Sequence, residues 1–344
     1  MSFPKEKREH IKRYILEKIS ARSPDVVKQT VQTFDISPNT VYRYIRELET
    51  TDIIKKDSSG YYLTTETKYY KLQRSNNELV NEDLIYHKYI RHWMEDSADN
   101  VRRIWEYSFT EMMNNAIDHS NAETVDIIIK KSYLNTVIFI KDNGIGIFRK
   151  IKEFYHYAQL DDAVKELFKG KLTTDSDNHS GEGIFFTSRA LDNFAAVSDG
   201  KIFTHSKYKE TMRNLADIEG LRQYKDSSGT IIYMELSNFS NKILKEVFDM
   251  FSDEDHGFTK THIPITNFYE TYPVSRSQAK RLCHRLDKFQ EIELDFAGVS
   301  EIGQGFAHEL FVVFQRKNQT VKITPVNASK EIEKMIKHVK NTTL

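Results

Sequence analysis

The segment Asp142-Asn143-Gly144-Ile145-Gly146 restricts the possible fold of this chain more than any other segment does. It directly follows residues 135–141, an apolar run that is typical of a strand. Its glycines permit positive φ angles and let a ligand approach the backbone closely, because they lack a Cβ atom. The carboxylate of Asp142 can accept a hydrogen bond from an exocyclic amine. The pattern favours a strand that ends at a binding site, although a plain tight turn has the same composition.

Two further segments place polar residues or glycines on predicted helices. Glu111 and Asn115 lie four residues apart, so they share one face of a helix that ends near residue 119. A carboxylate beside an amide oxygen suits water activation next to Mg²⁺, which takes oxygen ligands and keeps several waters. Ser180-Gly181-Glu182-Gly183 opens another predicted helix, where backbone N–H groups can bind an anion. Each pattern alone is common, and Glu-x-x-x-Asn is usually only a polar face of a helix.

The residues around these segments predict an α/β block over 83–240, preceded by a polar connector at 73–82. Asp199-Gly200 is a hairpin signal between two short strands of this block. The predicted elements are, in order, a long helix that ends near 119, strands at 124–130 and 135–141, a helix at 149–169, a helix at 181–192, strands at 194–198 and 201–205, and a last strand at 230–236.

In order and spacing, the three segments resemble the GHKL (Bergerat-fold, HATPase_c) superfamily. This superfamily includes DNA gyrase, heat-shock chaperone ATPases, histidine kinases, MutL-type proteins and anti-sigma-factor serine kinases. The resemblance covers about residues 85–238. Residues 111–115 are similar to the N box, 142–146 to the G1 box and 180–183 to the G2 box. Gly229-Thr230 resembles the threonine before the last strand of the family, so the resemblance implies an ATP-binding α/β sandwich.

The resemblance implies a role for each polar residue of these boxes, with ATP and Mg²⁺ as the ligands. Asn115 would coordinate the Mg²⁺ that bridges the phosphates. Glu111 would orient or deprotonate the attacking water or acceptor hydroxyl. Asp142 would bind the adenine amine, and Thr230 would support the base through Asp142 or a water.

The glycines of the boxes have implied roles as well. Gly144 and Gly146 would shape the base pocket, and Gly181 and Gly183 would let a lid over residues 170–180 close on the phosphates. The G2 box is short, because Phe185 stands where a histidine kinase has a further glycine. For the charged residues near the lid, a solvated surface is favoured over phosphate contact; these are Lys169, Lys171 and His179. His119 is expected to end or cap the preceding helix.

The N-terminal residues 1–72 have the order of a winged helix-turn-helix. Helical spacing of apolar residues predicts helices at 6–19 and 24–33. Ser37 offers an N-cap and Pro38 sits at the first position of a third helix, NTVYRYIRELE. The strand pair that follows turns at residues 57–60.

The charge of this N-terminal region favours DNA as its partner. Residues 1–74 contain 15 Lys/Arg and 10 Asp/Glu, whereas the whole chain has a net charge of zero. A basic module with a helix-turn-helix pattern is an electrostatic footprint for DNA, although winged helices also serve protein contacts. The residues expected to face the groove or the phosphates are Asn39, Thr40, Tyr42, Arg43, Arg46, Lys55 and Lys56.

The C-terminal residues 262–344 resemble a STAS-like (DUF4325) domain through the segments SRSQAKRL, ELDFAGVSEIGQGFAHELF and ITPVNAS. The predicted order over 275–338 is helix, strand, glycine loop, helix, strand and helix. STAS antagonists carry a phosphorylatable serine in this loop, but Gly303 and Gln304 occupy the position here and Ser300 is out of register. We therefore expect a docking module for a protein partner or for the chain itself, not a phosphoacceptor.

The predicted fold class of the three domains is α/β (α+β). Composition also restricts the cellular compartment in which they are expected to act. One cysteine, Cys283, excludes an internal disulfide and a cysteine-rich zinc site, and the N-terminus lacks an apolar signal region. The expected protein is a cytoplasmic, ATP-responsive, DNA-binding transcriptional regulator. By analogy with other winged-helix proteins, a homodimer is a candidate oligomeric state. Two alternatives remain open, a GHKL-type serine or histidine kinase that acts on a partner and a slow ATPase switch.

Overall fold

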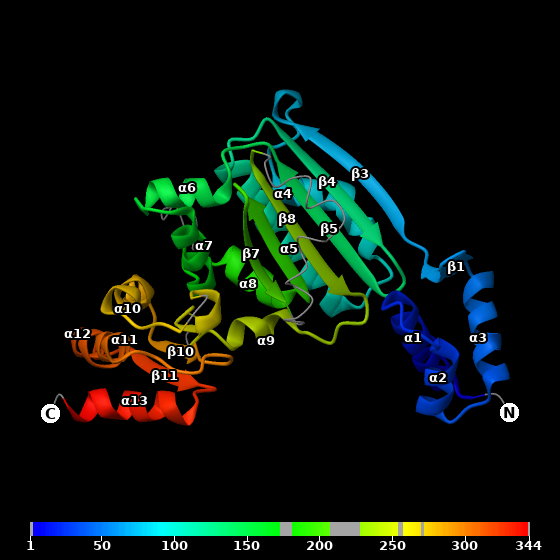
Figure 1. The fold of residues 1–344 in the computed structure, drawn as a ribbon. Helices are drawn as coiled ribbons and strands as arrows, with labels where there is room; N and C mark the ends of the chain where they lie inside the picture. The colour runs from blue at the N-terminus through cyan, green and yellow to red at the C-terminus, as the bar shows by residue number, and fades with distance from the viewer. Residues whose placement is uncertain (1–2, 173–180, 207–227, 254–256, 270–271, 343–344) are drawn as a thin grey trace.

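Figure 1 shows a central sheet with a helical unit at each end, so that the two termini lie far apart. The computed structural model describes residues 3–172, 181–206, 228–253, 257–269 and 272–342. Within these ranges the chain is a mixture of helices and strands, which confirms the predicted α/β class. Among the helices of the described ranges, none is long and apolar enough to cross a membrane.

The N-terminal unit has the expected order of helices and strands. Its elements are α1 (Lys5–Ser20), α2 (Val26–Phe34), α3 (Pro38–Thr50), β1 (Ile54–Asp57) and β2 (Gly60–Leu63). The Ser37 hydroxyl accepts a hydrogen bond from the Thr40 N–H at 3.3 Å, and Pro38 occupies the first turn, as predicted. Apolar residues of α1 and α3 form a core of their own, because the two helices turn their buried faces toward one another.

The third strand, β3 (Glu66–Gln73), does not belong to this N-terminal unit. It pairs antiparallel with β4 (Thr124–Lys131), from Glu66 opposite Lys131 to Gln73 opposite Thr124. Leu72 is buried in the core of the central domain. The expected end of the first domain at residue 72 therefore lies inside a strand of the central sheet.

The central sheet has six strands in the order β3-β4-β5-β8-β6-β7, and each neighbouring pair is antiparallel. The remaining strands are β5 (Asn135–Asp142), β6 (Asn193–Ser198), β7 (Lys201–Ser206) and β8 (Thr230–Ser237), all close to their predicted bounds. Asp199 and Gly200 both have positive φ angles, which a tight hairpin turn between β6 and β7 requires. Because β8 lies between β5 and β6, it brings Thr230 to the end of β5, beside Asp142.

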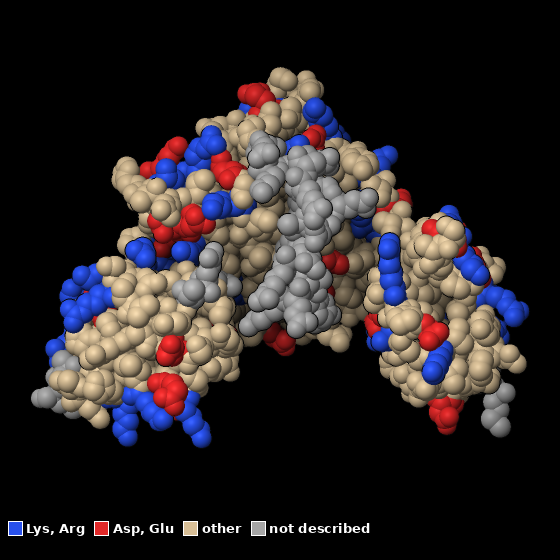
Figure 2. Space-filling model, viewed as in Figure 1, with Lys and Arg blue, Asp and Glu red and all other residues tan. Residues whose placement is uncertain are grey.

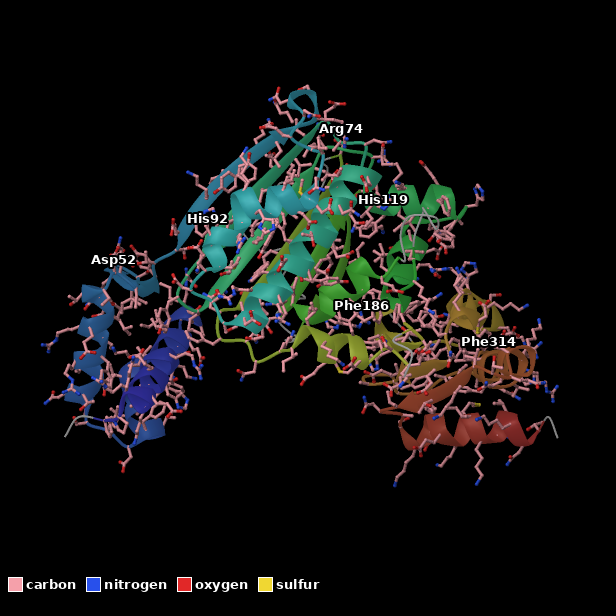
Figure 3. All side chains as sticks on the ribbon, turned by 180° about the vertical axis from the view of Figure 1, so that it is seen from behind. Asp52, Arg74, His92, His119, Phe186 and Phe314 are labelled. Atoms are coloured by element: carbon pink, nitrogen blue, oxygen red, sulfur yellow. The ribbon has the colours of Figure 1, made fainter. Side chains whose placement is uncertain are left out.

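Helices cover one face of this sheet, as Figures 1 and 3 show. They are α4 (Glu82–Ile85), η2 (Tyr86–Ile90), η3 (Arg91–Met94), α5 (Asp99–Asn114), η4 (Asn115–His119) and α8 (Gly183–Ala190). The short η1 (Arg74–Asn76) lies in the turn that follows β3. The expected single long helix before residue 119 is interrupted, because Ala98 is extended and α5 starts anew after it. The expected helix over 149–169 is also two helices, α6 (Ile147–Phe154) and α7 (Leu160–Lys169), with His156 at a positive φ between them.

The C-terminal unit is a three-stranded parallel sheet with helices around it. Its strands are β9 (Lys260–Pro264), β10 (Glu291–Asp295) and β11 (Lys322–Val326), in the order β11-β10-β9. Its helical elements, with α9 leading into it, are α9 (Leu244–Asp249), η7 (Ile265–Asn267), α10 (Arg276–Cys283), η8 (Leu286–Lys288), α11 (Gln304–His308), η9 (Glu309–Phe314), α12 (Gln315–Lys317) and α13 (Lys330–Asn341). The sequence did not predict β9, which is only five residues long and ends in proline.

The central and C-terminal units share one continuous apolar core. Phe258, just before β9, packs its ring against Phe185 of α8 at 4.6 Å and against Phe289 at 5.4 Å between centroids. The N-terminal core is a separate cluster. The described structure is thus a two-part body of central and C-terminal domains with a smaller unit attached.

Candidate nucleotide site

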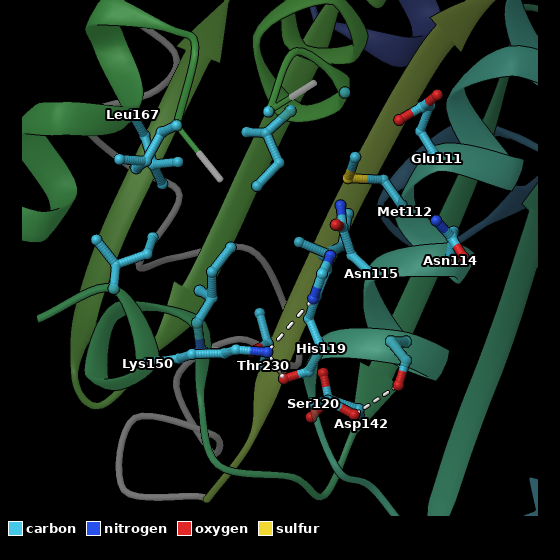
Figure 4. A pocket seen from close by; sticks show the side chains of 18 of the residues that line it. Glu111, Met112, Asn114, Asn115, His119, Ser120, Asp142, Lys150, Leu167 and Thr230 are labelled. Atoms are coloured by element: carbon cyan, nitrogen blue, oxygen red, sulfur yellow. Dashed lines mark hydrogen bonds between the residues drawn. The ribbon is translucent and has the colours of Figure 1, made fainter. Parts of the chain in front are cut away.

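A cavity of about 270 Å³ opens between α5, the end of β5, α6 and the start of α8. It brings together residues from four separate segments of the chain, as Figure 4 shows. The predicted residues that line it are Glu111, Asn115, Asp142, Gly146, Gly181, Gly183 and Thr230. Ligand cavities are typically a few hundred Å³ or more, so this volume is at the lower end of their range.

One end of the cavity is formed by Asp142, the last residue of β5. Asp142 is 5% exposed, and its carboxylate accepts a hydrogen bond from the Gly144 N–H at 2.8 Å. Burial raises the pKa of Asp142 above its usual value, and hydrogen bonds from Gly144 and Thr230 partly oppose this shift. A buried carboxylate gains most from a further donor, because desolvation of a charged acceptor is costly. This end of the cavity therefore fits a ligand with an amine group.

Thr230 supports the same end through a second contact. Its hydroxyl oxygen accepts a hydrogen bond from the Ile147 N–H at 3.0 Å, at the start of α6. Gly146 precedes α6 with a φ of +84°, and a Cβ there would lie 2.6 Å from the Ser198 hydroxyl. The turn after Asp142 is therefore fixed against both β8 and β6.

Gly144 contributes indirectly, since it does not line the cavity. A Cβ atom at this position would lie 2.0 Å from the carbonyl oxygen of Ser120. The neighbouring Ile145 N–H donates to that same oxygen at 2.9 Å. Gly144 thus lets the turn pack against the end of η4, and any side chain would push the two segments apart.

The other end of the cavity is formed by Glu111 and Asn115. A Cβ at Gly183 would lie 2.1 Å from a carboxylate oxygen of Glu111, so the glycine lets this carboxylate lie against the start of α8. The helix widens into a π-turn at Asn115–His119, a feature that occurs often at functional sites. Burial raises the pKa of Tyr107, and the nearby carboxylates of Glu111 and Glu182 raise it further. This concentration of negative charge, with the amide oxygen of Asn115 beside it, suits a hard divalent cation.

Three polar residues that the sequence did not place in the site also line the cavity: His119, Ser120 and Lys150. The Lys150 ammonium group donates to the His119 carbonyl oxygen at 2.8 Å and lies 3.3 Å from its Nδ1 (Figure 4). His119 is the last residue of η4, as expected of a helix-end histidine, but it also faces the cavity. Lys150 was recognisable in principle, because it follows Gly146 by one helical turn and its N–H bonds to the Gly146 carbonyl.

One of the two lysines near the predicted lid is not where the sequence placed it. Lys169 was expected on a solvated surface, with phosphate contact as the alternative, and both expectations are wrong. It is 0% exposed, and its ammonium group lies 2.5 Å from Glu166. Lys171 donates to the Lys288 carbonyl at 2.9 Å in the C-terminal domain. His179 and Ser180 lie outside the described residues.

Comparison with protein families identifies the domain that contains this cavity. Residues 102–238 match the histidine kinase-, DNA gyrase B- and HSP90-like ATPase family (HATPase_c). This region is therefore similar to the ATP-binding domains of the GHKL type. Residues 278–333 match the STAS-like domain of unknown function DUF4325. Comparison with curated proteins found no match.

The residues of the cavity fit ATP with Mg²⁺, the ligands typical of a HATPase_c domain. Gly183 lets the Glu111 carboxylate lie against the start of α8, and the buried carboxylate of Asp142 suits a ligand amine. Glu111 and Asn115 offer oxygen atoms at the opposite end, about which a cation with its waters can be held.

The residues expected to bind DNA lie on the N-terminal unit, away from this cavity. Asn39, Tyr42, Arg43 and Arg46 are exposed on α3, and Thr40 is half-buried beside its cap residue Ser37. Their spacing of three and four residues puts the exposed four on one face of the helix. Lys55 and Lys56 are exposed on β1. Figure 2 shows that acidic side chains occur on this unit beside the basic ones.

Proposed function

We propose that the chain is an ATP-responsive transcriptional regulator that binds DNA through its N-terminal unit. The exposed face of α3 carries the proposal: Asn39, Tyr42, Arg43 and Arg46 face solvent there, whereas the opposite face is buried. Arginine and asparagine side chains read base edges, arginine also binds phosphates, and a helix of this size fits the major groove. β1 and β2 would serve as the wing, with Lys55 and Lys56 against the phosphates.

The ATP site would bias DNA binding through the contact between the two units. Tyr133 and Leu134, in the turn between β4 and β5, pack against the N-terminal core. β5 continues from this turn to Asp142 in the cavity, and β3 joins the N-terminal unit directly to the same sheet. Any shift of the equilibrium is limited by the difference in ATP affinity between the two arrangements.

Each residue of the cavity has a proposed task. Asp142 accepts a hydrogen bond from the adenine amine, with Thr230 holding the turn behind it. Asn115 holds the Mg²⁺, which would neutralise phosphate charge. Glu111 orients a water at the far end, and the backbone N–H groups at Gly181 and Gly183 face the phosphates.

Removal of the basic face of α3 tests DNA binding. In Arg43→Ala/Arg46→Ala, the slope of log affinity against log salt should fall by about 2, since each phosphate contact contributes about 1. The measurement is fluorescence anisotropy with a labelled mixed-sequence duplex, with and without ATP–Mg²⁺. Lys334→Ala/Lys337→Ala is the matched control, because it removes two exposed cations, one of them ion-paired, from α13. Equal losses in both variants, or no binding by the wild type at low salt, contradict the proposal.

A second candidate function is catalysis, as a protein kinase or a slow ATPase. The position of Glu111 favours it, because this carboxylate lies against Gly183 at the end of the cavity opposite Asp142. Glu111→Gln should then abolish phosphate release while ATP binding persists. Transfer of labelled γ-phosphate to a co-purified protein would identify a kinase, whereas phosphate release alone would identify a switch.

A further inference from the structure

Three charged side chains form a buried cluster between the central and C-terminal domains. Glu166 and Lys169 come from α7, and Arg285 comes from the turn after α10. One carboxylate oxygen of Glu166 lies 2.5 Å from the Lys169 ammonium group, and the other lies 2.9 Å from the Arg285 guanidinium. Their exposed fractions are 4%, 0% and 7% for Glu166, Lys169 and Arg285, so water does not solvate them.

The cluster depends on partners from both domains. Burial alone would raise the pKa of Glu166, but bonds with His284, Lys169 and Arg285 hold the pKa below its usual value. Lys169 donates to the His284 carbonyl at 2.8 Å, and the Lys169 carbonyl accepts from the Thr261 hydroxyl at 2.8 Å. Buried charges are tolerated only when paired, so separation of the two domains would leave uncompensated ions.

Arg285 also holds the backbone of the segment that leads from α7 into the cavity. Its guanidinium donates to the Lys171 carbonyl and, at 3.5 Å, to the Gly170 carbonyl. Gly170 and Leu172 both line the cavity. The Leu172 N–H in turn donates to the Gly181 carbonyl at 3.0 Å, and Gly181 lines the cavity as well.

The aromatic core makes the same connection on the other side of this segment. A Cβ at Gly170 would lie 2.7 Å from the ring of Phe258 and 2.8 Å from that of Phe185. Phe185 lines the cavity, and Phe258 belongs to the approach to β9. The wall of the cavity formed by Gly170, Leu172 and Phe185 therefore rests on residues of the C-terminal domain.

We infer that Arg285 is a positioning residue for the nucleotide site, through which the docked C-terminal domain sets the affinity of the central domain for ATP. The inference rests on ATP binding in the cavity, as proposed above. Without the guanidinium, the Gly170–Leu172 wall loses its hydrogen-bond donor and Glu166 loses one of its two cations. Coupling between two sites is reciprocal, so ATP must stabilise the docked arrangement by the same factor.

The first test is the affinity of the full chain for ATP–Mg²⁺, measured by calorimetry. Arg285→Met keeps most of the buried volume and should raise the dissociation constant by about tenfold, within the usual range of coupling factors. Arg285→Lys keeps the charge without the planar fork and should give a smaller rise. Ile336→Ala, in a buried position of α13 away from the cluster, is the control for general destabilisation and should leave the affinity unchanged.

The second test uses Cys283, the single cysteine of the chain, as a reporter of docking. Burial raises the pKa of its thiol to about 12, and Lys169 and Glu309 act on it electrostatically. ATP–Mg²⁺ should slow modification of this thiol by an aromatic disulfide reagent in the wild type. In Arg285→Met, the rate of modification should no longer depend on ATP, whereas a purely structural role would make modification faster and leave its dependence on ATP.

The outcomes separate this inference from the proposed function. If the wild type does not bind ATP–Mg²⁺, the proposed function fails and the inference fails with it. If the wild type binds ATP–Mg²⁺ and both Arg285 variants bind it with the affinity of the wild type, only the inference is overturned. An unchanged affinity in the Arg285 variants together with ATP-independent thiol modification in the wild type would show that the two domains are docked but uncoupled.

Discussion

The two ends of the chain are attached to the central domain in different ways. The C-terminal domain shares its apolar core with the central domain and adds a buried ionic cluster at the junction. The N-terminal unit has a core of its own. Its contacts with the central domain include the turn residue Tyr133 and the half-exposed Phe239, whose ring lies 5.4 Å from the Arg13 guanidinium.

This difference suggests a division of labour. A shared core transmits strain directly, because packed interiors have few voids and resist deformation. The C-terminal domain is therefore suited to set the shape of the nucleotide site. A small, partly polar contact costs little to break, so the N-terminal unit is suited to change its orientation when the site is filled.

The largest effect should follow from removal of the aromatic link at the C-terminal junction. Phe258→Ala deletes a ring that is 5% exposed and should destabilise the folded chain by about 3–5 kcal/mol. Because the core is shared, the substitution should lower the stability of the central and C-terminal domains together, as measured by chemical denaturation. The N-terminal transition should not move.

Phe239→Ala is the matched control for this prediction. It removes the same side chain at the N-terminal junction, where 40% of Phe239 is exposed. Its expected cost is below about 1 kcal/mol, since little apolar area is lost from the interior. Separate unfolding of the central and C-terminal domains in the wild type would contradict the comparison.

A smaller effect should come from the carboxylate at the base end of the cavity. Asp142→Asn should weaken ATP binding by about 1.5–3 kcal/mol, the contribution of a hydrogen bond to a charged group. Calorimetry with ATP–Mg²⁺ measures this loss. A variant that binds ATP as the wild type does would remove Asp142 from the proposed site.

Asp142→Asn weakens ATP binding, but it should stabilise the folded protein in the absence of nucleotide. The pKa of Asp142 is raised in the folded state, so its contribution to stability is fully present below its usual value of 3.8 and is lost as the pH rises through the raised value. As the pH rises from 3.8 through the raised pKa of Asp142, the stability of the wild type should therefore fall relative to that of Asp142→Asn. Thermal unfolding without nucleotide, compared at acidic and neutral pH, tests the sign.

The contrast between the two junctions also explains what the sequence could predict. Glu111 and Asn115 lie within one helix, and Asp142 ends a strand. Each motif is therefore formed by neighbouring residues, and its spacing in the sequence was enough to identify it. The partners Glu166 and Arg285 are 119 residues apart, and charged residues on helices usually face solvent. Nothing in their local sequence indicates that they meet in a buried cluster.

The strands show the same limit. The hairpin at Asp199-Gly200 was predicted, because both strands and the turn are adjacent in sequence. β3 was not predicted, and most of its residues were placed with the N-terminal domain, because its partner β4 lies beyond five short helical elements and α5. The break at His156 inside the expected helix was missed as well, since no glycine or proline marks it in the sequence and α6 and α7 pack against each other only in the folded chain.

The smallest effect should appear at the N-terminal junction. Arg13→Ala removes the cation above the Phe239 ring and should weaken the attachment of the N-terminal unit by about 0.5–1 kcal/mol, the contribution of an exposed cation–π contact. The affinity for ATP should not change, because the nucleotide wall rests on the C-terminal domain. If the N-terminal junction transmits the nucleotide signal, DNA affinity measured by anisotropy should depend less on ATP in this variant than in the wild type. Lys18→Ala, which removes a cation over the Tyr14 ring within the same helix, is the control. A change in ATP affinity in Arg13→Ala would show that both ends of the chain shape the nucleotide site, and the division of labour would have to be abandoned.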